Sequence, residues 1–252
     1  MARLDDIWYE NFAAWARAHP GGYTATRSGW RIASLGSPWP FYNVATAVTE
    51  GFAEAGGTAE YLQVAYAGAV GYRVWLRDDM DGAEAALRQA RFQAIDEIPA
   101  FWMPLSEVAI APVPAGYEVV RAETDAEIVE CLLGDRWAGY MDDAEVARTF
   151  PDPAGMAREG DRSFYLGRYQ GDLVATGQTI SIGGVVGTYG MWTSEPHRRH
   201  GLAAAILARG LTNARDAGQE FGSIQASELG AEIYQRSGFR RYCNYRIYRP
   251  PL

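Results

Sequence analysis

The most constraining feature of this chain is a segment in which a bulky, strand-like run stops at a proline and a helix begins a few residues later. Residues 189–203 read Tyr-Gly-Met-Trp-Thr-Ser-Glu-Pro-His-Arg-Arg-His-Gly-Leu-Ala and continue into helix-forming residues. The first amides of a helix have no partners within it and lie at the positive end of its dipole, so they attract anions. Gly201 leaves room for an anion to reach the backbone, and Arg198 and Arg199 supply positive charge. The segment predicts a diphosphate-binding loop, although the same basic run would also suit an exposed turn.

A second segment strengthens this interpretation. Residues 227–239 read Ser-Glu-Leu-Gly-Ala-Glu-Ile-Tyr-Gln-Arg-Ser-Gly-Phe. Together the two segments resemble the GCN5-related N-acetyltransferase (GNAT) superfamily, and the resemblance extends over roughly residues 116–250. In that family a strand leads into a loop with the pattern Arg or Gln, two residues, Gly, one residue, Gly or Ala. Arg198, Gly201 and Ala203 match this pattern.

The family's second motif lies on a helix that carries a Tyr, with Gly-Phe four or five residues later. Tyr234, Gly238 and Phe239 fit it, and Ser227 stands where many members have Asn. The resemblance implies an enzyme that transfers an acyl group from acetyl-CoA, or another acyl-CoA, to an amine. The amine would attack directly in a ternary complex, so neither a covalent enzyme intermediate nor a metal is implied.

The resemblance also assigns roles within the site. The backbone of the fourth strand pairs with the pantetheine arm, and one amide there would polarise the thioester carbonyl. Tyr234 would be the general acid that protonates the leaving thiolate, the alternative being an ordinary aromatic side chain on the core face of its helix. The implied cofactor-binding residues are Met191, Trp192, Thr193, Arg198, Arg199, His200, Gly201, Leu202, Ala203 and Ser227.

The general base is not identified by the motifs. Glu195, just beyond the fourth strand, is our catalytic candidate, and a solvated cap is the alternative interpretation. His197 and His200 titrate in a suitable range, but loop packing or contact with the cofactor is favoured for both. Asp142 and Asp143 suit the binding of a substrate cation better than proton abstraction, or they simply face water on a helix.

Composition excludes several other chemistries. All 23 basic side chains are Arg, because the chain contains no Lys. A Walker phosphate loop, a pyridoxal Schiff base and a Lys nucleophile each need an ammonium group or its free amine, so all three are excluded. Arg must therefore bind phosphate, for which its planar and permanently charged fork is suited. The formal net charge of -8 argues against nucleic acid as a general partner, because such binding depends on clustered positive charge.

Charge is unevenly distributed over the half of the chain that carries the motifs. Acids outnumber Arg in residues 111–190, whereas Arg outnumber acids in residues 191–252. This layout would favour an anionic cofactor at one end and a cationic amine at the other. Ordinary solvated surface is the alternative explanation.

The sequence gives no sign of secretion, of a membrane partner or of a metal site. The start, Met-Ala-Arg-Leu-Asp-Asp, carries charge where a signal peptide needs an apolar run, and no stretch approaches the roughly 20 apolar residues of a membrane span. Cys131 and Cys243 are too few for a disulfide framework, and no Cys/His cluster has metal-ligand spacing. We therefore expect a cytoplasmic protein with reduced core thiols.

The chain divides into two halves at a proline-containing segment. Residues 109–116 hold two prolines that interrupt helices and β-ladders alike, which predicts a linker. A shift of 147 residues lays segments 41–48, 72–76 and 87–92 of the first half on strands and a helix of the second. We therefore expect an α/β fold with a mixed sheet, made of two tandem GNAT-like acyl-CoA N-acyltransferase domains of which the C-terminal one is complete.

The predicted boundaries are a degenerate domain over residues 1–110, a linker over 111–115 and a catalytic domain over 116–252. Residues 51–56 of the first half fall on the diphosphate loop but hold no Arg, and Leu87 stands in the place of the catalytic Tyr. We expect the first half to be structural, to cover the exposed edge strand of the second, to wall the acceptor pocket and to make the protein a monomer. Chance similarity between two α/β segments is the alternative.

Hydrophobic periodicity and turn residues predict how helices and strands alternate along the chain. In the first half we expect helices over residues 4–19, 61–69 and 82–94 and strands over 23–35, 41–48 and 72–76. In the second half we expect helices over residues 124–134, with a Thr124–Glu127 capping box, and 142–149, and strands over 117–122, 164–169, 173–182 and 185–193, the last three joined by hairpin turns.

The acceptor is the least constrained part of the prediction. Loops 137–143 and 150–158 would form its pocket, and Trp137, Tyr140 and Phe150 predict a partly apolar cavity. A small-molecule amine, such as an amino acid or an aminated natural product, is favoured over a protein tail.

Two alternatives to this function stay open. One is a noncatalytic module that senses acyl-CoA, against which the retained Tyr234 argues. The other is an acyltransferase whose donor is the phosphopantetheine arm of a carrier protein. That arm lacks adenosine diphosphate, so Arg198 and Arg199 would then have a smaller role.

Overall fold

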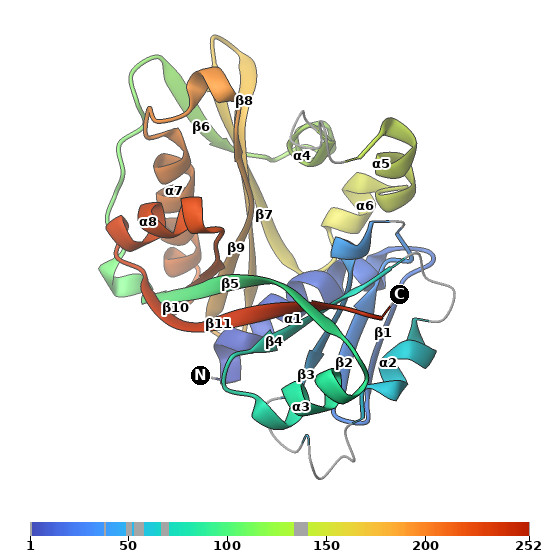
Figure 1. The fold of residues 1–252 in the computed structure, drawn as a ribbon. Helices are drawn as coiled ribbons and strands as arrows, with labels where there is room; N and C mark the ends of the chain where they lie inside the picture. Colours follow the sequence, from blue (N-terminus) through green and yellow to red (C-terminus); the bar gives the residue numbers. More distant parts are fainter. Residues whose placement is uncertain are drawn as a thin grey trace.

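The strands of the described part of the chain form one 11-stranded mixed sheet, with helices against both faces (Figure 1). The strand order is β1-β2-β3-β4-β11-β5-β10-β9-β8-β7-β6. The computed structural model describes residues 2–37, 39–48, 52, 58–66, 71–133 and 141–251.

Helices and strands alternate in both halves, as the periodicity predicts. The first half contains α1 (Ala2–Ala18), β1 (Tyr23–Arg27), β2 (Trp30–Ser34), the 3-10 helix η1 (Pro40–Tyr42), β3 (Asn43–Ala47), α2 (Glu60–Ala65), β4 (Arg73–Arg77), α3 (Asp81–Gln89), β5 (Gln93–Pro104) and η2 (Leu105–Glu107). The second half contains β6 (Tyr117–Arg121), α4 (Asp125–Leu133), α5 (Asp143–Thr149), α6 (Pro153–Ala157), β7 (Asp161–Tyr169), β8 (Asp172–Ile182), β9 (Val185–Thr193), η4 (Glu195–His197), α7 (Leu202–Asp216), β10 (Phe221–Gln225), α8 (Glu228–Arg236) and β11 (Arg240–Arg249).

The paired strands β11 and β5 divide the sheet into four strands from the first half and five from the second. Each half ends in a long strand that crosses to the other half: β5 pairs antiparallel with β10, and β11 pairs antiparallel with β4. The two crossing strands also pair with each other, and they lie side by side at the centre of Figure 1. Without β5, β10 would be an open edge, because its other neighbour is β9. The first half therefore covers the edge strand of the second.

The predicted correspondence between the halves is visible in the topology. Each half contains one parallel pair, β3–β4 and β9–β10, followed by a helix and then by the crossing strand. The shift of 147 residues places α3 on residues 228–236, which are the bounds of α8. Residues 108–116, which include the predicted linker, belong to no helix or strand.

Two local expectations for the first half are wrong. The predicted strand over residues 23–35 is a hairpin, because Ser28 and Gly29 both take left-handed backbone angles and reverse the chain between β1 and β2. The predicted helix over residues 82–94 ends at Gln89, where Arg91 takes the left-handed conformation that usually falls to Gly at a helix end. The chain then enters β5, a strand that the sequence patterns did not reveal.

In the second half the local predictions hold. Glu127 N donates to Thr124 Oγ1 at 3.3 Å and Thr124 N donates to Glu127 Oε2 at 3.0 Å, which is the expected capping box. Gln170 and Gly171 both have positive φ, as a two-residue hairpin turn requires.

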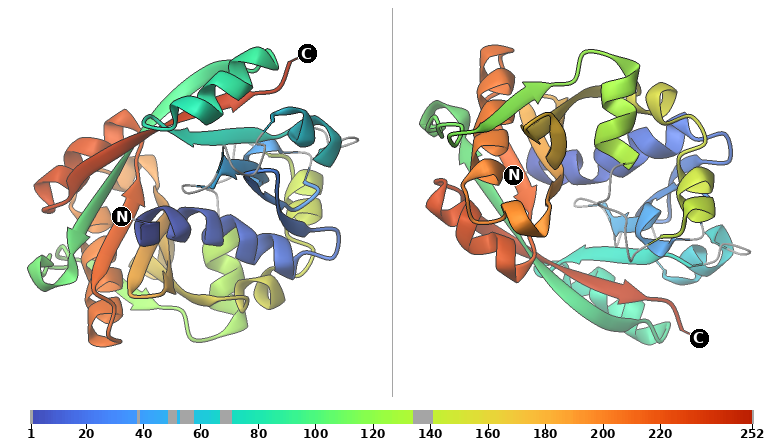
Figure 2. Two further views of the ribbon diagram at one scale, coloured as in Figure 1. Left: turned by 90° about the horizontal axis from the view of Figure 1, so that it is seen from below. Right: turned by 90° about the horizontal axis from the view of Figure 1, so that it is seen from above.

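Helix α1 joins the two halves, and Figure 2 shows it running between them. Trp8, Phe12 and Trp15 of this helix are buried in the largest hydrophobic cluster, which contains residues of both halves. Cys131 and Cys243 are buried, as predicted for core thiols. No described helix is long and apolar enough to cross a membrane.

Candidate functional site

The site begins where two parallel strands part. β9 and β10 pair only through residues 185–187 and 221–223, after which β9 continues to Thr193 and β10 to Gln225. A cavity of about 430 Å³ opens along both strand ends. Its lining comes from α1, η1 and β4 of the first half and from β8, β9, β10 and α8 of the second: Trp8, Asn11, Phe12, Trp15, Trp39, Phe41, Tyr42, Trp75, Gln178, Thr188, Tyr189, Gly190, Met191, Trp192, Ile224, Gln225, Ala226, Ser227, Gly230 and Tyr234.

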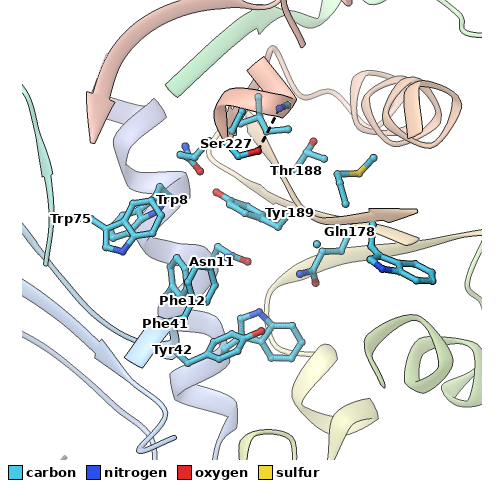
Figure 3. A pocket seen from close by; sticks show the side chains of 18 of the residues that line it. Trp8, Asn11, Phe12, Phe41, Tyr42, Trp75, Gln178, Thr188, Tyr189 and Ser227 are labelled. Atoms are coloured by element: carbon cyan, nitrogen blue, oxygen red, sulfur yellow. Dashed lines mark hydrogen bonds between the residues drawn. The ribbon is translucent and has the colours of Figure 1, made fainter. Parts of the chain in front are cut away.

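The two halves contribute chemically different walls to this cavity. Figure 3 shows Trp8, Trp75, Phe12, Phe41 and Tyr42 together on one side and Gln178, Thr188 and Ser227 on another. We call the aromatic residues that the first half contributes to the cavity the aromatic wall; they are Trp8, Phe12, Trp15, Trp39, Phe41, Tyr42 and Trp75. The polar wall is formed by Gln178, Thr188 and Gln225 of the second half.

The polar wall carries buried groups with no protein partner in the described part of the chain. They are Oε1 of Gln178, Oγ1 of Thr188 and both amide atoms of Gln225, and Nε1 of Trp75 is in the same condition on the aromatic wall. A buried donor or acceptor without a partner costs about 1–3 kcal/mol, so native structures contain few of them. These groups are therefore available to hydrogen-bond water or a ligand in the cavity.

A bulge in β9 lies at the same cavity. Thr176 of β8 faces Trp192, but Gln178 faces Tyr189, so Gly190 and Met191 of β9 lie opposite the single Gly177. A bulge turns backbone groups out of the ladder, and Gly190 has the positive φ that eases it. The bulge falls at the predicted pantetheine-binding residues, and Gly190, Met191 and Trp192 line the cavity.

The predicted diphosphate loop is open to solvent. Gly201 is the N-cap of α7 with φ 87°, and no side chain caps this helix. Arg198, Arg199, His200 and Gly201 are exposed, and Nε of Arg198 donates to the Thr193 carbonyl at 3.0 Å. The free amides of the first turn and two exposed guanidinium groups therefore face the same solvent region.

The residues that follow Gly201 anchor the loop. Leu202 is buried against the sheet with Tyr165 and Ala175, and the first α-helical bond runs from Ala205 N to the Gly201 carbonyl at 3.0 Å. Ala203 is half-buried in the first turn. The helix start is thus held firmly while its amide end stays accessible.

Tyr234 lines the cavity from α8. Burial raises the pKa of its phenol from 10.0 to about 12, so the group stays protonated at neutral pH. A Cβ at Gly230 would lie 3.0 Å from the Tyr234 ring, so the ring rests against a bare helix turn. Ser227 also lines the cavity, and its Oγ accepts a hydrogen bond from Gly230 N at 3.4 Å as the N-cap of α8.

The candidate general bases do not line the cavity. Glu195 is exposed in η4 and is not among the lining residues. His197 packs against Tyr169, and its Nδ1 lies 3.0 Å from the Tyr117 hydroxyl, while the His200 ring lies 6.0 Å from that of Tyr117. The structure therefore shows loop packing for His197, whereas His200 is exposed.

The residues expected to form the acceptor pocket are also elsewhere. Asp142 is exposed and its Oδ1 accepts from Glu145 N at 2.8 Å as the cap of α5, and Asp143 faces solvent in the same turn. Phe150 is buried against Trp15 and Tyr42 rather than exposed in the cavity.

Trp137 and Tyr140 lie outside the described residues. The described groups of His, Cys, Asp and Glu include none that could hold a metal ion. The cavity is partly apolar, and Phe150, the one described member of the three predicted aromatics, does not line it.

A buried cation beside the cavity was missed altogether. Arg162 of β7 is 9% exposed, and its Nη1 and Nη2 donate to Oδ1 and O of Asn11 at 2.9 and 2.7 Å. Its guanidinium lies 4.2 Å from the centre of the Trp15 ring, and no described carboxylate forms an ion pair with it. Desolvation lowers its pKa to about 9, which still leaves it protonated at neutral pH. The sequence does not indicate that Arg162 is buried, because its partner Asn11 lies far away in the chain. Only the packing of α1 against β7 brings the two residues together.

Comparison with solved structures identifies the fold. No protein-family model matches the sequence, and no curated protein matches it either. A GCN5-related N-acetyltransferase from Kribbella flavida matches over 100% of this chain and 95% of its own, with a TM-score of 0.74 and 20% identity. A tandem GNAT protein from the clavulanic acid biosynthesis pathway matches over 98% of this chain and 95% of its own, with a TM-score of 0.65 and 15% identity.

A third structure, a GCN5-related N-acetyltransferase from Sphaerobacter thermophilus, covers 88% of this chain and 78% of its own at a TM-score of 0.60 and 16% identity. The match to the tandem protein extends over both halves, which agrees with the repeated strand order seen here. The chain therefore has the GCN5-related N-acetyltransferase fold, in a two-domain arrangement like that of the tandem GNAT protein.

Proposed function

We propose that this protein is an N-acetyltransferase that moves an acyl group from acetyl-CoA to the amine of a small molecule. The observation that carries the proposal is the succession of three features along the chain from β9 to α7. They are the cavity that Tyr234 also lines, the bulge at Gly190, and the exposed and uncapped helix start at Gly201. Such a succession suits a long ligand with an anionic end and a reactive thioester end.

The residues present fit this ligand chemically. Arg198, Arg199 and the first amides of α7, including that of Ala203, would hold the diphosphate. Backbone of Met191, Trp192 and Thr193 would bind the pantetheine arm along the free side of β9, where pairing with β10 has ended. The buried amide of Gln225 on the opposite strand needs a partner that such an arm supplies.

The thioester supplies an acyl group with a good leaving group. The chain's residues hold it next to the amine, so that the attack becomes effectively intramolecular. A backbone amide at the bulge would stabilise the negative charge that develops on the carbonyl oxygen. As the nitrogen–carbon bond forms and the carbon–sulfur bond breaks, the Tyr234 phenol protonates the departing sulfur.

Proton removal from the amine does not require a side chain of the cavity. Glu195 remains a candidate that acts from outside through ordered water, because it follows directly on β9. The positive charge left on the attacking nitrogen makes this proton acidic, so solvent itself is an adequate acceptor. Ser227 contributes by capping the helix that carries Tyr234.

The proposal also covers the location, the oligomeric state and the partners of the enzyme. We propose a cytoplasmic monomer with no nucleic-acid or membrane partner. The crossing strands β5 and β11 already pair the inner edges of the two half-sheets within one chain. Light scattering of the purified protein checks the monomer, which a stable dimer would contradict.

A thiol-release assay tests the function. Purified protein is titrated with acetyl-CoA by calorimetry, and release of free CoA is then followed across a panel of amines, with mass spectrometry of the product. We expect binding and acetylation of at least one amine. Binding without release across the panel, with no difference between wild type and Tyr234→Phe, would instead indicate the acyl-CoA sensor. Faster transfer from an acyl-carrier protein than from acetyl-CoA would indicate the carrier-protein donor.

A further inference from the structure

We propose that the acceptor is an arylamine, a primary amine whose nitrogen is attached directly to a flat aromatic ring and is uncharged at neutral pH. This inference rests on the proposed function, because it concerns the second substrate of the same cavity. Three independent features of the cavity support it: its aromatic wall, the sign of the charge beside it and its unpaired polar groups.

The aromatic wall is a continuous packed surface. The Trp8 and Trp75 rings lie 4.9 Å apart, Phe12 and Phe41 lie 5.4 Å apart, and the Phe41 ring stacks on Trp39 at 5.1 Å. Flat rings bind such a surface by stacked or edge-to-face contacts, which add to the burial of apolar area. Phe41 is 39% exposed, so this wall extends to the surface of the molecule.

The charge beside the cavity disfavours a cationic acceptor. The described lining residues include no Asp, Glu, His or Arg. The buried charge next to the cavity is the positive guanidinium of Arg162, held by Asn11, which itself lines the cavity. In a poorly solvated site a positive charge repels an ammonium group strongly. A polyamine or an aminoglycoside therefore fits poorly, whereas an uncharged amine is not penalised.

An uncharged amine also fits the absence of a base among the described lining residues. An alkylammonium must lose a proton before its nitrogen can attack, and a carboxylate or imidazole usually accepts that proton. The nitrogen of an arylamine shares its lone pair with the ring and is already unprotonated at neutral pH. Attack can therefore start without a prior proton transfer.

The polar wall matches the amino group. Oε1 of Gln178 and Oγ1 of Thr188 are buried acceptors without a protein partner, and they lie across the cavity from the aromatic wall (Figure 3). An arylamine has two N–H donors, and one N–H survives in the product amide. These oxygens would hold the nitrogen in line with the acyl group while the ring packs on the aromatic wall.

The reaction balances without another reactant. The nitrogen–carbon bond forms and the carbon–sulfur bond breaks; the nitrogen loses one proton to solvent, and the sulfur gains one from Tyr234, which solvent then restores. The products are an N-aryl amide and free CoA.

Three amines that each contain a six-membered ring test the flat ring and the uncharged nitrogen separately. Aniline is flat and uncharged, benzylamine is flat but protonated, and cyclohexylamine is protonated and not flat. We measure kcat/KM for each by CoA release at saturating acetyl-CoA, and amine binding to the CoA-loaded protein by calorimetry. We expect aniline to bind at least tenfold more tightly than cyclohexylamine, benzylamine to fall between them, and the aniline rate to be constant from pH 7 to 9.

Two variants with equal exposure provide the matched control. Phe41→Ala removes an aromatic ring of the wall, whereas Tyr23→Ala removes a ring that is also 39% exposed but is not among the lining residues. We expect Phe41→Ala to raise the KM for aniline at least fivefold without changing the KM for acetyl-CoA, and Tyr23→Ala to change neither.

The outcomes distinguish this inference from the proposed function. Equal or tighter binding of cyclohexylamine, or an unchanged aniline KM in Phe41→Ala, overturns the arylamine while acetyl-CoA binding and thiol release still stand. If acetyl-CoA itself does not bind, the proposed function fails first. If CoA binds and no amine is turned over, the calorimetric order of the three amines still decides the class of acceptor.

Discussion

The two halves of the sheet repeat one topology, but only the second half begins its key helix in a way that can bind an anion. After the parallel strand β9, the 15-residue α7 starts at Gly201 with an uncapped, exposed end. After the equivalent strand β3, α2 has 6 residues and carries the acidic Glu60 in its first turn. Negative charge at a helix N-terminus satisfies the dipole itself and repels a phosphate. The two equivalent helices thus differ in the charge of their first turn, which is acidic in α2 and has no acid in α7.

The second difference lies on the helix after the parallel pair. α8 presents Tyr234 to the cavity, whereas Leu87 of α3 is fully buried in the hydrophobic core of the first half. α8 is capped by Ser227, but α3 follows Met80, whose side chain makes no capping bond. The first half has therefore exchanged polar functional positions for apolar packing, and it contributes to the site through its aromatic wall instead.

The largest expected effect comes from placing an acidic residue, such as Glu60 provides in the first half, at the start of α7 in the second half. Gly201→Glu places a carboxylate and a Cβ at the diphosphate loop, and we expect acetyl-CoA affinity to fall at least 100-fold, because about 3 kcal/mol of anion contacts are lost and replaced by repulsion. Gly171→Glu is the matched control, since that glycine also has positive φ and free space around it. Calorimetry should show weak binding only for the first variant; equal loss in both would mean that the loop does not bind the cofactor.

Replacing Tyr234 by Leu, the residue type at the equivalent position of the first half, should lower catalysis without weakening acetyl-CoA binding. We expect Tyr234→Leu and Tyr234→Phe to lower kcat about 100-fold or more, because a general acid typically contributes about 10² to 10⁴. The KM for acetyl-CoA should stay within about twofold, since the diphosphate contacts remain. Tyr248→Phe, which removes a hydroxyl bonded to Glu84 at 2.8 Å and outside the cavity lining, is the control for losing a phenol. Retained turnover in Tyr234→Phe would exclude the phenol as the acid.

The raised pKa of Tyr234 predicts a pH dependence of stability that Leu87 cannot show. The folded state keeps the phenol protonated up to about pH 12, whereas the unfolded chain ionises near pH 10. The stabilisation from this group is therefore present below pH 10 and is lost as the pH rises towards 12, by up to about 1 kcal/mol at pH 11. Urea unfolding at pH 8 and pH 11 should show a smaller loss in Tyr234→Phe than in the wild type. Parallel losses would contradict the burial of this phenol.

The unpaired polar wall should make the second half less stable than it could be. Replacing Thr188 by Val removes a buried hydroxyl without a protein partner, and we expect about 1 kcal/mol of added stability together with weaker acceptor binding. Thr176→Val is the control, because its hydroxyl donates to the Gly190 carbonyl at 3.2 Å and its loss should destabilise. Thermal unfolding measures whether each variant is more or less stable than the wild type. Destabilisation in both variants would show that the Thr188 hydroxyl has a hydrogen-bond partner.

The smallest effects concern the two helix caps. We expect Ser227→Ala to cost about 1 kcal/mol in the free energy of unfolding, and Met80→Ser to gain a few tenths by adding the cap that the first half lacks. Urea denaturation of both variants tests this reciprocal pair. Opposite signs would confirm that the equivalent helices differ in their caps.

Much of the second half was predictable because its signals are local. The helix start at Gly201, the capping box at Thr124 and the hairpin turn at Gln170–Gly171 each depend on neighbouring residues, and each forms where the sequence predicts it. Prediction failed where conformation depends on an unusual backbone angle. Arg91 ends α3 in the left-handed region without any glycine to signal it, so β5 was missed.

The sequence by itself determined the class of fold, the two-part chain and the loop and helix that carry Arg198, Gly201 and Tyr234, because strand, turn and helix-start patterns act over short distances. Only the tertiary structure decided that the halves exchange their last strands and that an aromatic wall from α1, η1 and β4 faces the polar wall of the second half. It also decided that Arg162 is buried beside Asn11. These contacts join residues far apart in the chain, and long-range packing leaves no periodic signal in the sequence.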